Sequence, residues 1–159
     1  MKESILQLKD YFFTKTAVEV NKDFNFSKPS DLGVDDLLID LESEILKHPN
    51  TGEQIFKVSL RVVAKPEDQP ECNLPYSIDI TAIGLFGLNE SCQENRESIA
   101  VINGASILFS SIREYASVIT SQGPFRKIVL PTVDLRGLKK LNKEQQAPIS
   151  RPKTTKKKA

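Results

Sequence analysis

The stretch from Ala105 to Asp134 constrains the fold of this chain more than any other part of the sequence. Apolar side chains recur there at the spacing of one helix face, at Leu108, Ile112, Tyr115 and Ile119. Gly123 is expected to end this helix in a positive-φ conformation, and Pro124 prevents its continuation. The pattern predicts a long amphipathic helix.

The residues after this helix predict an extended connection and a second, shorter helix. The connection covers residues 127–131, where apolar and β-branched side chains lead to Pro131. Asp134 is a suitable N-cap for the short helix, which would run through Leu135, Leu138 and Leu141.

Four segments before the long helix are predicted to be β-strands. Residues 6–20 are rich in aromatic and β-branched side chains, and residues 54–64 and 76–88 alternate between apolar and polar positions. The segment beginning at Leu37 also alternates, although Leu37, Leu41 and Ile45 would fit a helix as well. The turn cluster from His48 to Gly52 favours the strand, because it would join two strands in an antiparallel hairpin.

The order of these elements predicts an α+β fold: a four-stranded antiparallel sheet followed by one long and one short helix packed on one of its faces. Residues 1–142 are expected to form one domain, and residues 143–159 a basic, disordered tail. A single sheet of this kind has two open edges and a second face, which favours assembly with further copies of the chain.

The residue inventory argues against an enzyme, a metal site or a bound cofactor. His48 is the only histidine and sits in the hairpin turn, so no histidine-based metal cluster or catalytic triad is expected. Cys72 and Cys92 are too far apart for a redox pair and are interpreted as free thiols. Glycine-rich phosphate-binding motifs, a signal peptide and a membrane-spanning stretch are missing from the sequence, so a cytoplasmic location is expected.

Several short motifs, in the order in which they occur, resemble the SecB family of export chaperones. The strongest are Ile107-Leu-Phe109 with Arg113-Glu114, then Gly123-Pro-Phe125, and then Leu130-Pro131-Thr-Val133. The similarity extends from about Leu6 to Leu138. The chain departs from the family where Phe-Pro is common after the glycine and Phe125-Arg126 stands here, and where the first strand has Thr16 and Val20 in place of acidic residues.

The resemblance implies an ATP-independent chaperone that holds unfolded polypeptides and assembles as a tetramer, a dimer of dimers. It places client-binding side chains on the second strand and in the loop before it, with two weaker candidates on the fourth strand: Leu37, Ile39, Leu41, Phe24, Phe26, Tyr76 and Phe86. It implies a surface facing the motor protein SecA at Asp79 and Glu19. It assigns the oligomer interface to the long helix, at Leu108, Ile112, Tyr115 and Ile119.

Two other functions stay open on the sequence. A SecB-like chaperone could guard an aggregation-prone antitoxin in place of serving export, and the missing first-strand carboxylates favour that alternative mildly. A non-chaperone interaction module could instead contact nucleic acid through the lysine-rich tail, although the tail lacks the interleaved aromatic residues that such binding uses.

Overall fold

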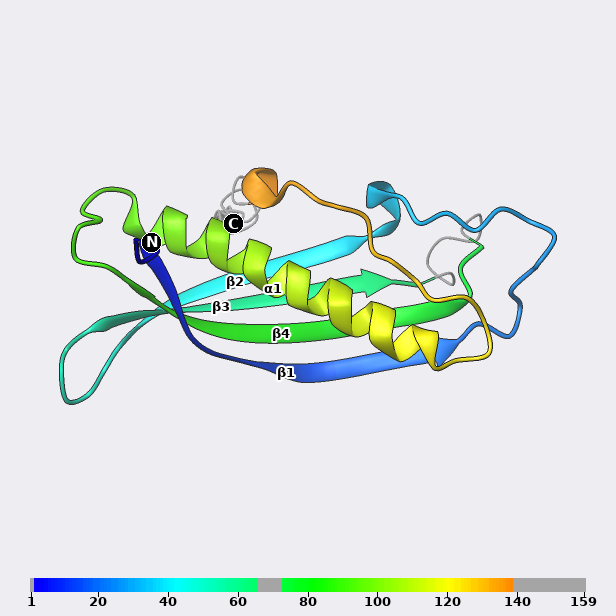
Figure 1. Cartoon of the computed structure of the whole chain (residues 1–159), viewed down its shortest axis with the longest axis horizontal. Coiled ribbons are helices and arrows are strands. Elements are labelled where there is room, and N and C mark those ends of the chain that lie inside the picture. The colour runs from blue at the N-terminus through cyan, green and yellow to red at the C-terminus, as the bar shows by residue number, and fades with distance from the viewer. Residues whose placement is uncertain (1, 66–72, 139–159) are drawn as a thin grey trace, which may run out of the picture.

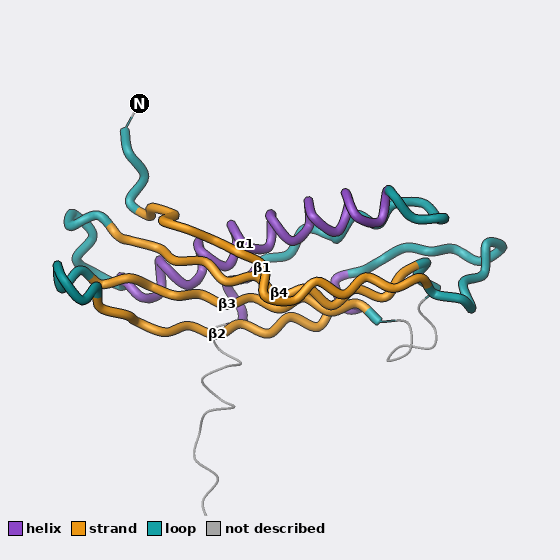
Figure 2. The backbone as a smooth tube through the Cα atoms, turned by 90° about the horizontal axis from the view of Figure 1, so that it is seen from below, coloured by secondary structure: helices purple, strands orange, loops and turns teal. Residues whose placement is uncertain are grey.

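The computed structural model describes residues 2–65 and 73–138. Its main elements are four strands and a long helix, which form two layers with the helix crossing one face of the sheet (Figures 1 and 2). In chain order the elements are β1 (Leu6–Val20), the 3-10 turn η1 (Val34–Asp36), β2 (Leu38–Lys47), β3 (Gln54–Ala64), β4 (Tyr76–Leu88), α1 (Arg96–Ser121) and the 3-10 turn η2 (Leu135–Gly137). The predicted α+β fold is confirmed.

The sheet has the strand order β1-β4-β3-β2, and every neighbouring pair is antiparallel. The hairpin between β2 and β3 closes as predicted, with the backbone N–H of His48 donating to the carbonyl of Glu53 at 2.8 Å. Gly52 supplies a positive φ of 70° in this turn, a conformation that glycine adopts without steric cost. The first strand crosses over to pair with β4, so the loop at 21–33 must span the end of the sheet.

The edge strand β1 contains two register shifts, one between Leu8 and Asp10 and one between Phe13 and Lys15. At the second shift Phe13 pairs with Ala82 while Lys15 pairs with Thr81. Phe13 therefore points to the face that carries α1, and Lys15 points to the opposite face, which we call the outer face of the sheet. A β-bulge of this kind adds one residue and reverses the alternation of side chains beyond it.

The helix begins at Arg96, well before the predicted start at Ala105. Gly104 interrupts the apolar pattern and is a poor helix former, which is why the first turns do not stand out in the sequence. A Cβ at residue 104 would lie 2.9 Å from the ring of Phe86 on β4. The glycine therefore allows the helix to approach the sheet closely, and this packing outweighs its low helix propensity.

The prediction that Gly123 ends the helix with a positive φ is wrong. Gln122 is the C-cap, with φ −90° and ψ −5°, and Gly52 is the only glycine in the described part of the chain with a positive φ. The space at residue 123 is instead filled by the phenol ring of Tyr76, with which a Cβ would collide. Glycine is required there by close packing and not by backbone conformation.

The segment after α1 returns along the same face of the sheet toward η2 (Figure 1). The side chain of Thr120 accepts a hydrogen bond from the backbone N–H of Ile128 at 2.9 Å, which fixes the start of this return. Asp134 caps η2 as predicted, because its carboxylate accepts from the backbone N–H of Arg136. The described part of the second helix is a single 3-10 turn, and Leu141 and the tail at 143–159 lie outside the described residues, as does Cys72.

Candidate functional site

Three phenylalanine rings meet at the end of the sheet where β1 stops and α1 ends. Phe24 and Phe26 belong to the loop after β1, and Phe125 follows the helix. The ring centroids are 5.0 Å apart for Phe24 and Phe26, 5.0 Å for Phe24 and Phe125, and 5.2 Å for Phe26 and Phe125. Phe26 is 76 % exposed, so this cluster, which we call the aromatic triad, presents a large apolar surface to solvent.

Tyr76 fixes the position of Phe125 by hydrogen bonds to its backbone. Its hydroxyl accepts a hydrogen bond from the backbone N–H of Phe125 at 2.9 Å and donates to the carbonyl of the same residue at 3.2 Å. Tyr76 is only 2 % exposed and its ring packs on Gly123. The structure therefore places Tyr76, a weaker candidate for client contact, in the support of the triad.

The loop that carries Phe24 and Phe26 is held to the start of β4 by asparagine side chains. Asn73 accepts from the backbone N–H of Asn25 at 2.9 Å and donates to the carbonyl of Asn25 at 2.8 Å. Asn21 donates to the carbonyl of Leu74 at 2.7 Å. These bonds satisfy backbone groups that a loop without regular structure would leave unpaired, and they orient the two rings.

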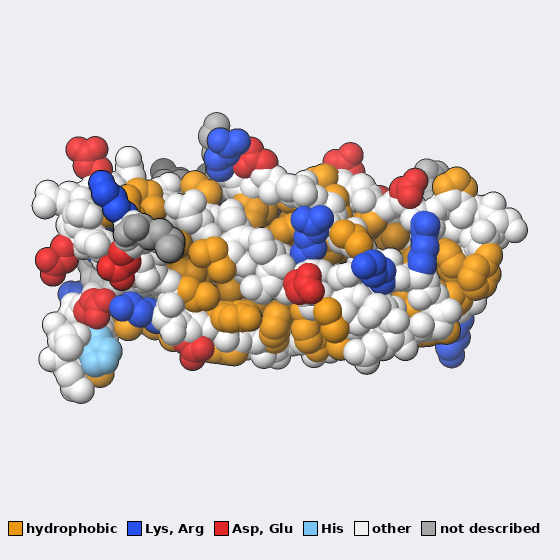
Figure 3. All heavy atoms as spheres, in the orientation of Figure 1, with side chains coloured by type: hydrophobic (Ala, Val, Ile, Leu, Met, Phe, Trp, Pro, Cys, Tyr) orange, Lys and Arg blue, Asp and Glu red, His pale blue; other side chains and the backbone are white. Residues whose placement is uncertain are grey.

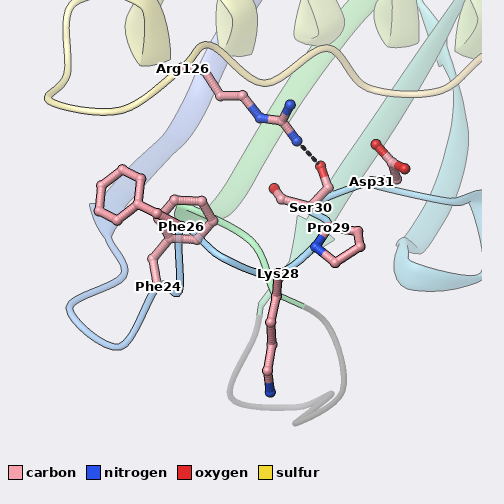
Figure 4. A pocket seen from close by; sticks show the side chains of 7 residues that line it. All are labelled: Phe24, Phe26, Lys28, Pro29, Ser30, Asp31 and Arg126. Atoms are coloured by element: carbon pink, nitrogen blue, oxygen red, sulfur yellow. Dashed lines mark hydrogen bonds between the residues drawn. The ribbon is translucent and has the colours of Figure 1, made fainter.

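A pocket of about 340 Å³ opens beside the triad (Figure 4). Its lining combines two of the rings with charged and polar side chains: Phe24, Phe26, Lys28, Pro29, Ser30, Asp31 and Arg126. Arg126 donates a hydrogen bond from its guanidinium to the carbonyl of Ser30, which ties the segment after α1 to the loop after β1. Apolar rings beside a few polar groups are typical of ligand-binding pockets.

The remaining candidates for client contact lie at different depths. Leu37 and Ile39 are half-buried and pack against the core from the edge strand β2 and the residue before it. Leu41 is buried in the core, and Phe86 is 0 % exposed beneath α1. Phe26 in the aromatic triad is therefore the most exposed of these candidates, while Leu37 and Ile39 are partly accessible at the opposite edge of the sheet.

The outer face of the sheet carries a network of charges around Asp79. The carboxylate of Asp79 accepts two hydrogen bonds from Arg61, both at 2.9 Å, and one from Lys15 at 2.6 Å. Asp79 is 3 % exposed, and the hydrogen bonds from Arg61, opposed by burial, hold its pKa well below the usual range. Arg61 also lies 3.6 Å from the exposed carboxylate of Asp40. Asp79 is thus neutralised by its neighbours, whereas Glu19 is exposed at the end of β1.

The four predicted interface residues on α1 divide into two pairs. Leu108 and Ile112 are fully buried between the helix and the sheet of the same chain, so they offer no surface to a second copy. Tyr115 and Ile119 are half-buried, and the ring of Tyr115 stacks on Phe13 of β1 at 4.7 Å.

An apolar strip continues outward from that stacked pair. Its members are exposed large hydrophobic side chains on β1 and on α1, namely Leu8, Tyr11, Ile107 and Val118. Figure 3 shows hydrophobic side chains gathered in the lower half of the view, over β1 and the neighbouring part of α1. We call this surface the β1–α1 strip.

The described residues contain no group of three or more side chains that could hold a metal ion. Within the same part of the chain, no helix is both long and apolar enough to cross a membrane. His48 is partly exposed in the hairpin turn, where its Nδ1 accepts from the backbone N–H of Asn50. Cys92 is a buried free thiol.

A family model described as "Preprotein translocase subunit SecB" matches residues 36–146, which is more than half of the chain. The chain belongs to the SecB family. The sheet from β2 to β4, the helix α1 and the turn η2 all lie within the matched range, whereas β1, Phe24 and Phe26 precede it.

Curated relatives carry the name protein-export protein SecB. The protein from Bradyrhizobium diazoefficiens is 30% identical over 97 residues, which cover 61% of this chain and 59% of the relative. The protein from Nitrobacter hamburgensis is 29% identical and covered to 62%, and that from Ehrlichia chaffeensis is 27% identical over 134 residues and covered to 72%. The aligned part of the chain thus spans about six-tenths of the first two SecB proteins.

A solved structure with a similar fold is the SecB-like chaperone of Mycobacterium tuberculosis, in complex with a peptide from an antitoxin. The TM-score is 0.49 at 18% sequence identity, with 80% of this chain and 87% of that chain covered.

Sequence reasoning did not assign Phe125 and Arg126 to the site, although both belong to it. The signal was present, because an aromatic residue directly after Gly123 and Pro124 cannot lie on the buried face of a helix that has ended. The sequence alone does not indicate which residues Phe125 contacts. Phe125 meets Phe24 only because β1 pairs with β4 and brings the loop after β1 beside the end of α1.

Proposed function

We propose that this SecB-family protein is an ATP-independent holdase that binds unfolded polypeptides for export. The observation that carries the proposal is the aromatic triad, three rings in contact with one another, one of them 76 % exposed and all held by hydrogen-bonded loops. An exposed cluster of this kind lowers solubility unless it binds something. The names of the family and of the curated relatives support export as the purpose.

The physical basis of binding is the transfer of apolar side chains from water. An unfolded client that covers the triad, Leu37 and Ile39 gains about 25 cal/mol for each Å² of apolar surface removed from water. Such contacts are weak individually. A client that binds several such sites on one assembly would be held more tightly, because each further site is present at a high effective concentration. Binding and release need no chemical step, so neither catalysis nor a nucleotide is part of the proposal. The proposed location of the protein is the cytoplasm.

The proposed assembly is a tetramer in which a second copy of the chain covers the β1–α1 strip. The strip joins an open sheet edge to one side of the helix, so one partner can bury both at once. Tyr115 and Ile119 would lie in this interface with Ile107 and Val118.

SecA is the proposed partner for export, with the outer face of the sheet as its docking surface. Asp79 does not offer a free carboxylate there, because Arg61 and Lys15 surround it. Glu19 and Glu42 are exposed and carry carboxylates without an ion pair among the described residues, so they are among the acidic groups that a basic surface of SecA could reach. We therefore expect Glu19→Gln to weaken SecA binding in calorimetric titration, with Ser77→Ala as the control on the same face.

The proposed function is tested by light scattering from an aggregating, chemically unfolded protein in the absence of nucleotide. Wild type should suppress aggregation near one assembly per client. Phe26→Asp should weaken suppression severalfold, because it places a charge in the triad at an exposed position where folding is not at risk. The matched control is Ile45→Asp, an exposed apolar position on β2 away from the triad.

Other outcomes distinguish the alternatives. No suppression by a well-folded wild type would refute the holdase. Suppression limited to an antitoxin segment, with no effect on export precursors, would support the antitoxin alternative. Salt-dependent nucleic-acid binding that disappears when residues 149–159 are deleted would support the interaction module.

A further inference from the structure

We infer that the pocket beside the aromatic triad selects client segments in which an acidic residue lies close to an aromatic one, and that Arg126 is the residue that determines this specificity. The inference rests on the proposed function and names the class of segment that the site prefers. It comes from the charges beside the aromatic triad, which Figure 4 shows together with the pocket.

Arg126 has the position needed for this role. It is exposed, it lines the pocket with Phe24 and Phe26, and it follows Phe125 directly in the chain. A client ring that packs on the triad would therefore place its neighbouring side chains within reach of the guanidinium.

The guanidinium is held in place but not neutralised. One of its nitrogens donates to the carbonyl of Ser30, which fixes the side chain across the mouth of the pocket. Asp31 also lines the pocket, yet no ion pair joins it or any other carboxylate of residues 2–65 and 73–138 to Arg126. The remaining N–H groups are thus available to a carboxylate, which a guanidinium binds with two parallel hydrogen bonds.

The charges around the pocket favour an anion over a cation. Among the described residues that line it, Lys28 and Arg126 carry positive charge against the single carboxylate of Asp31. A glutamate or aspartate of the client would be attracted, and a lysine at the same place would meet like charge. An arginine held in its bound position loses less side-chain freedom on binding than a mobile surface lysine.

The test measures the affinity of three labelled, unstructured peptides by fluorescence anisotropy at low salt. The peptides share a phenylalanine and differ only at a position two residues later, which is glutamate, glutamine or lysine. We expect wild type to bind the glutamate peptide about threefold to tenfold more tightly than the glutamine peptide, with the lysine peptide weakest. Raising the salt concentration should reduce the difference.

Two substitutions test whether Arg126 causes the preference for the glutamate peptide. Arg126→Gln should bring the affinities for the glutamate and glutamine peptides to the same value. The ratio of the two affinities is the readout, because the variant also loses the hydrogen bond to the carbonyl of Ser30. Lys127→Gln removes the same charge one residue away, outside the pocket lining, and should keep the discrimination.

The outcomes separate this inference from the proposed function. Equal affinity for all three peptides, or discrimination that survives in Arg126→Gln, would overturn the selectivity while leaving the holdase intact. If wild type binds none of the peptides and does not suppress aggregation, both the proposed function and the inference fall.

Discussion

Asp79 is the only charged side chain among the described residues that lies in the buried part of the molecule. Its two cationic partners come from different strands, Lys15 on β1 and Arg61 on β3, so the carboxylate of β4 joins three neighbouring strands. A buried carboxylate is costly unless its oxygens are hydrogen-bonded, and here three hydrogen bonds meet that need. We interpret Asp79 as a structural residue of the outer face.

Replacing Asp79 with asparagine should lower the free energy of unfolding by about 1–3 kcal/mol at pH 7, because the charge-assisted bonds to Arg61 and Lys15 are lost. The pKa of Asp79 is depressed in the folded protein, so its contribution is complete above the ordinary carboxyl pKa of about 4 and declines as the pH falls below it. Urea denaturation of wild type and variant at pH 7 and pH 3 measures both effects.

Asp40→Asn serves as the control for this prediction. Asp40 also lies near Arg61, but its carboxylate is exposed, and exposed pairs contribute little to stability, about 0–1 kcal/mol. Equal losses in the two variants, or a difference between Asp79→Asn and wild type that grows as the pH falls, would contradict the structural role of Asp79.

At the scale of elements, the junction between α1 and the segment after it depends on Tyr76. The phenol occupies the space that a side chain at residue 123 would need and holds both backbone groups of Phe125. The end of the helix, the start of β4 and the aromatic triad are therefore connected through one ring.

Gly123→Ala should displace that ring and lower the free energy of unfolding by about 1–3 kcal/mol, since overpacking in a rigid environment forces neighbours to move. It should also weaken client binding, because Phe125 loses its support. Tyr76→Phe should reproduce the loss of binding with a smaller loss of stability of about 1 kcal/mol. Thermal unfolding and peptide anisotropy on the same samples separate the two effects.

The matched control is Gly137→Ala in η2, where a Cβ would meet nothing within 4 Å. This variant should keep both stability and binding. A Gly123→Ala protein that binds and unfolds like wild type would show that the contact with Tyr76 does not position Phe125.

The elements were predictable to different degrees, for physical reasons. The strands showed alternation or β-branched residues, so β1, β3 and β4 begin and end where the sequence indicated. The first turns of α1 were missed because Gly104 interrupts the apolar pattern of the helix. Glycine is needed there because the ring of Phe86, which is distant in the sequence, packs against it. Phe24 and Phe26 were identified because aromatic residues in a polar loop are unusual, whereas Phe125 and Arg126 depend on strand pairing that local patterns do not encode.

At the scale of the whole molecule, the β1–α1 strip is the surface that we propose to mediate assembly. Val118→Glu places a charge on an exposed part of the strip and should shift the protein to a smaller species, because an unpaired charge at an apolar interface is costly. The mass measured by light scattering coupled to gel filtration reports the change. Folding should be preserved, since Val118 is 45 % exposed in the single chain.

Ile45→Glu is the matched control for assembly. Ile45 is exposed to a similar extent but lies on β2, at the opposite edge of the sheet from β1. If both variants keep the mass of wild type, the strip is not the interface. If wild type is itself a monomer, the proposed tetramer is refuted.

The pairing of β1 with β4 has a consequence for synthesis on the ribosome. Strands β3 and β4 can each pair with the strand before them as they emerge, whereas β1 leaves the ribosome earlier and has no partner until residues 76–88 are available. Closing so long a loop is slow compared with forming a hairpin. A protein whose proposed task is to hold unfolded polypeptides would thus itself expose an unpaired strand during much of its own translation.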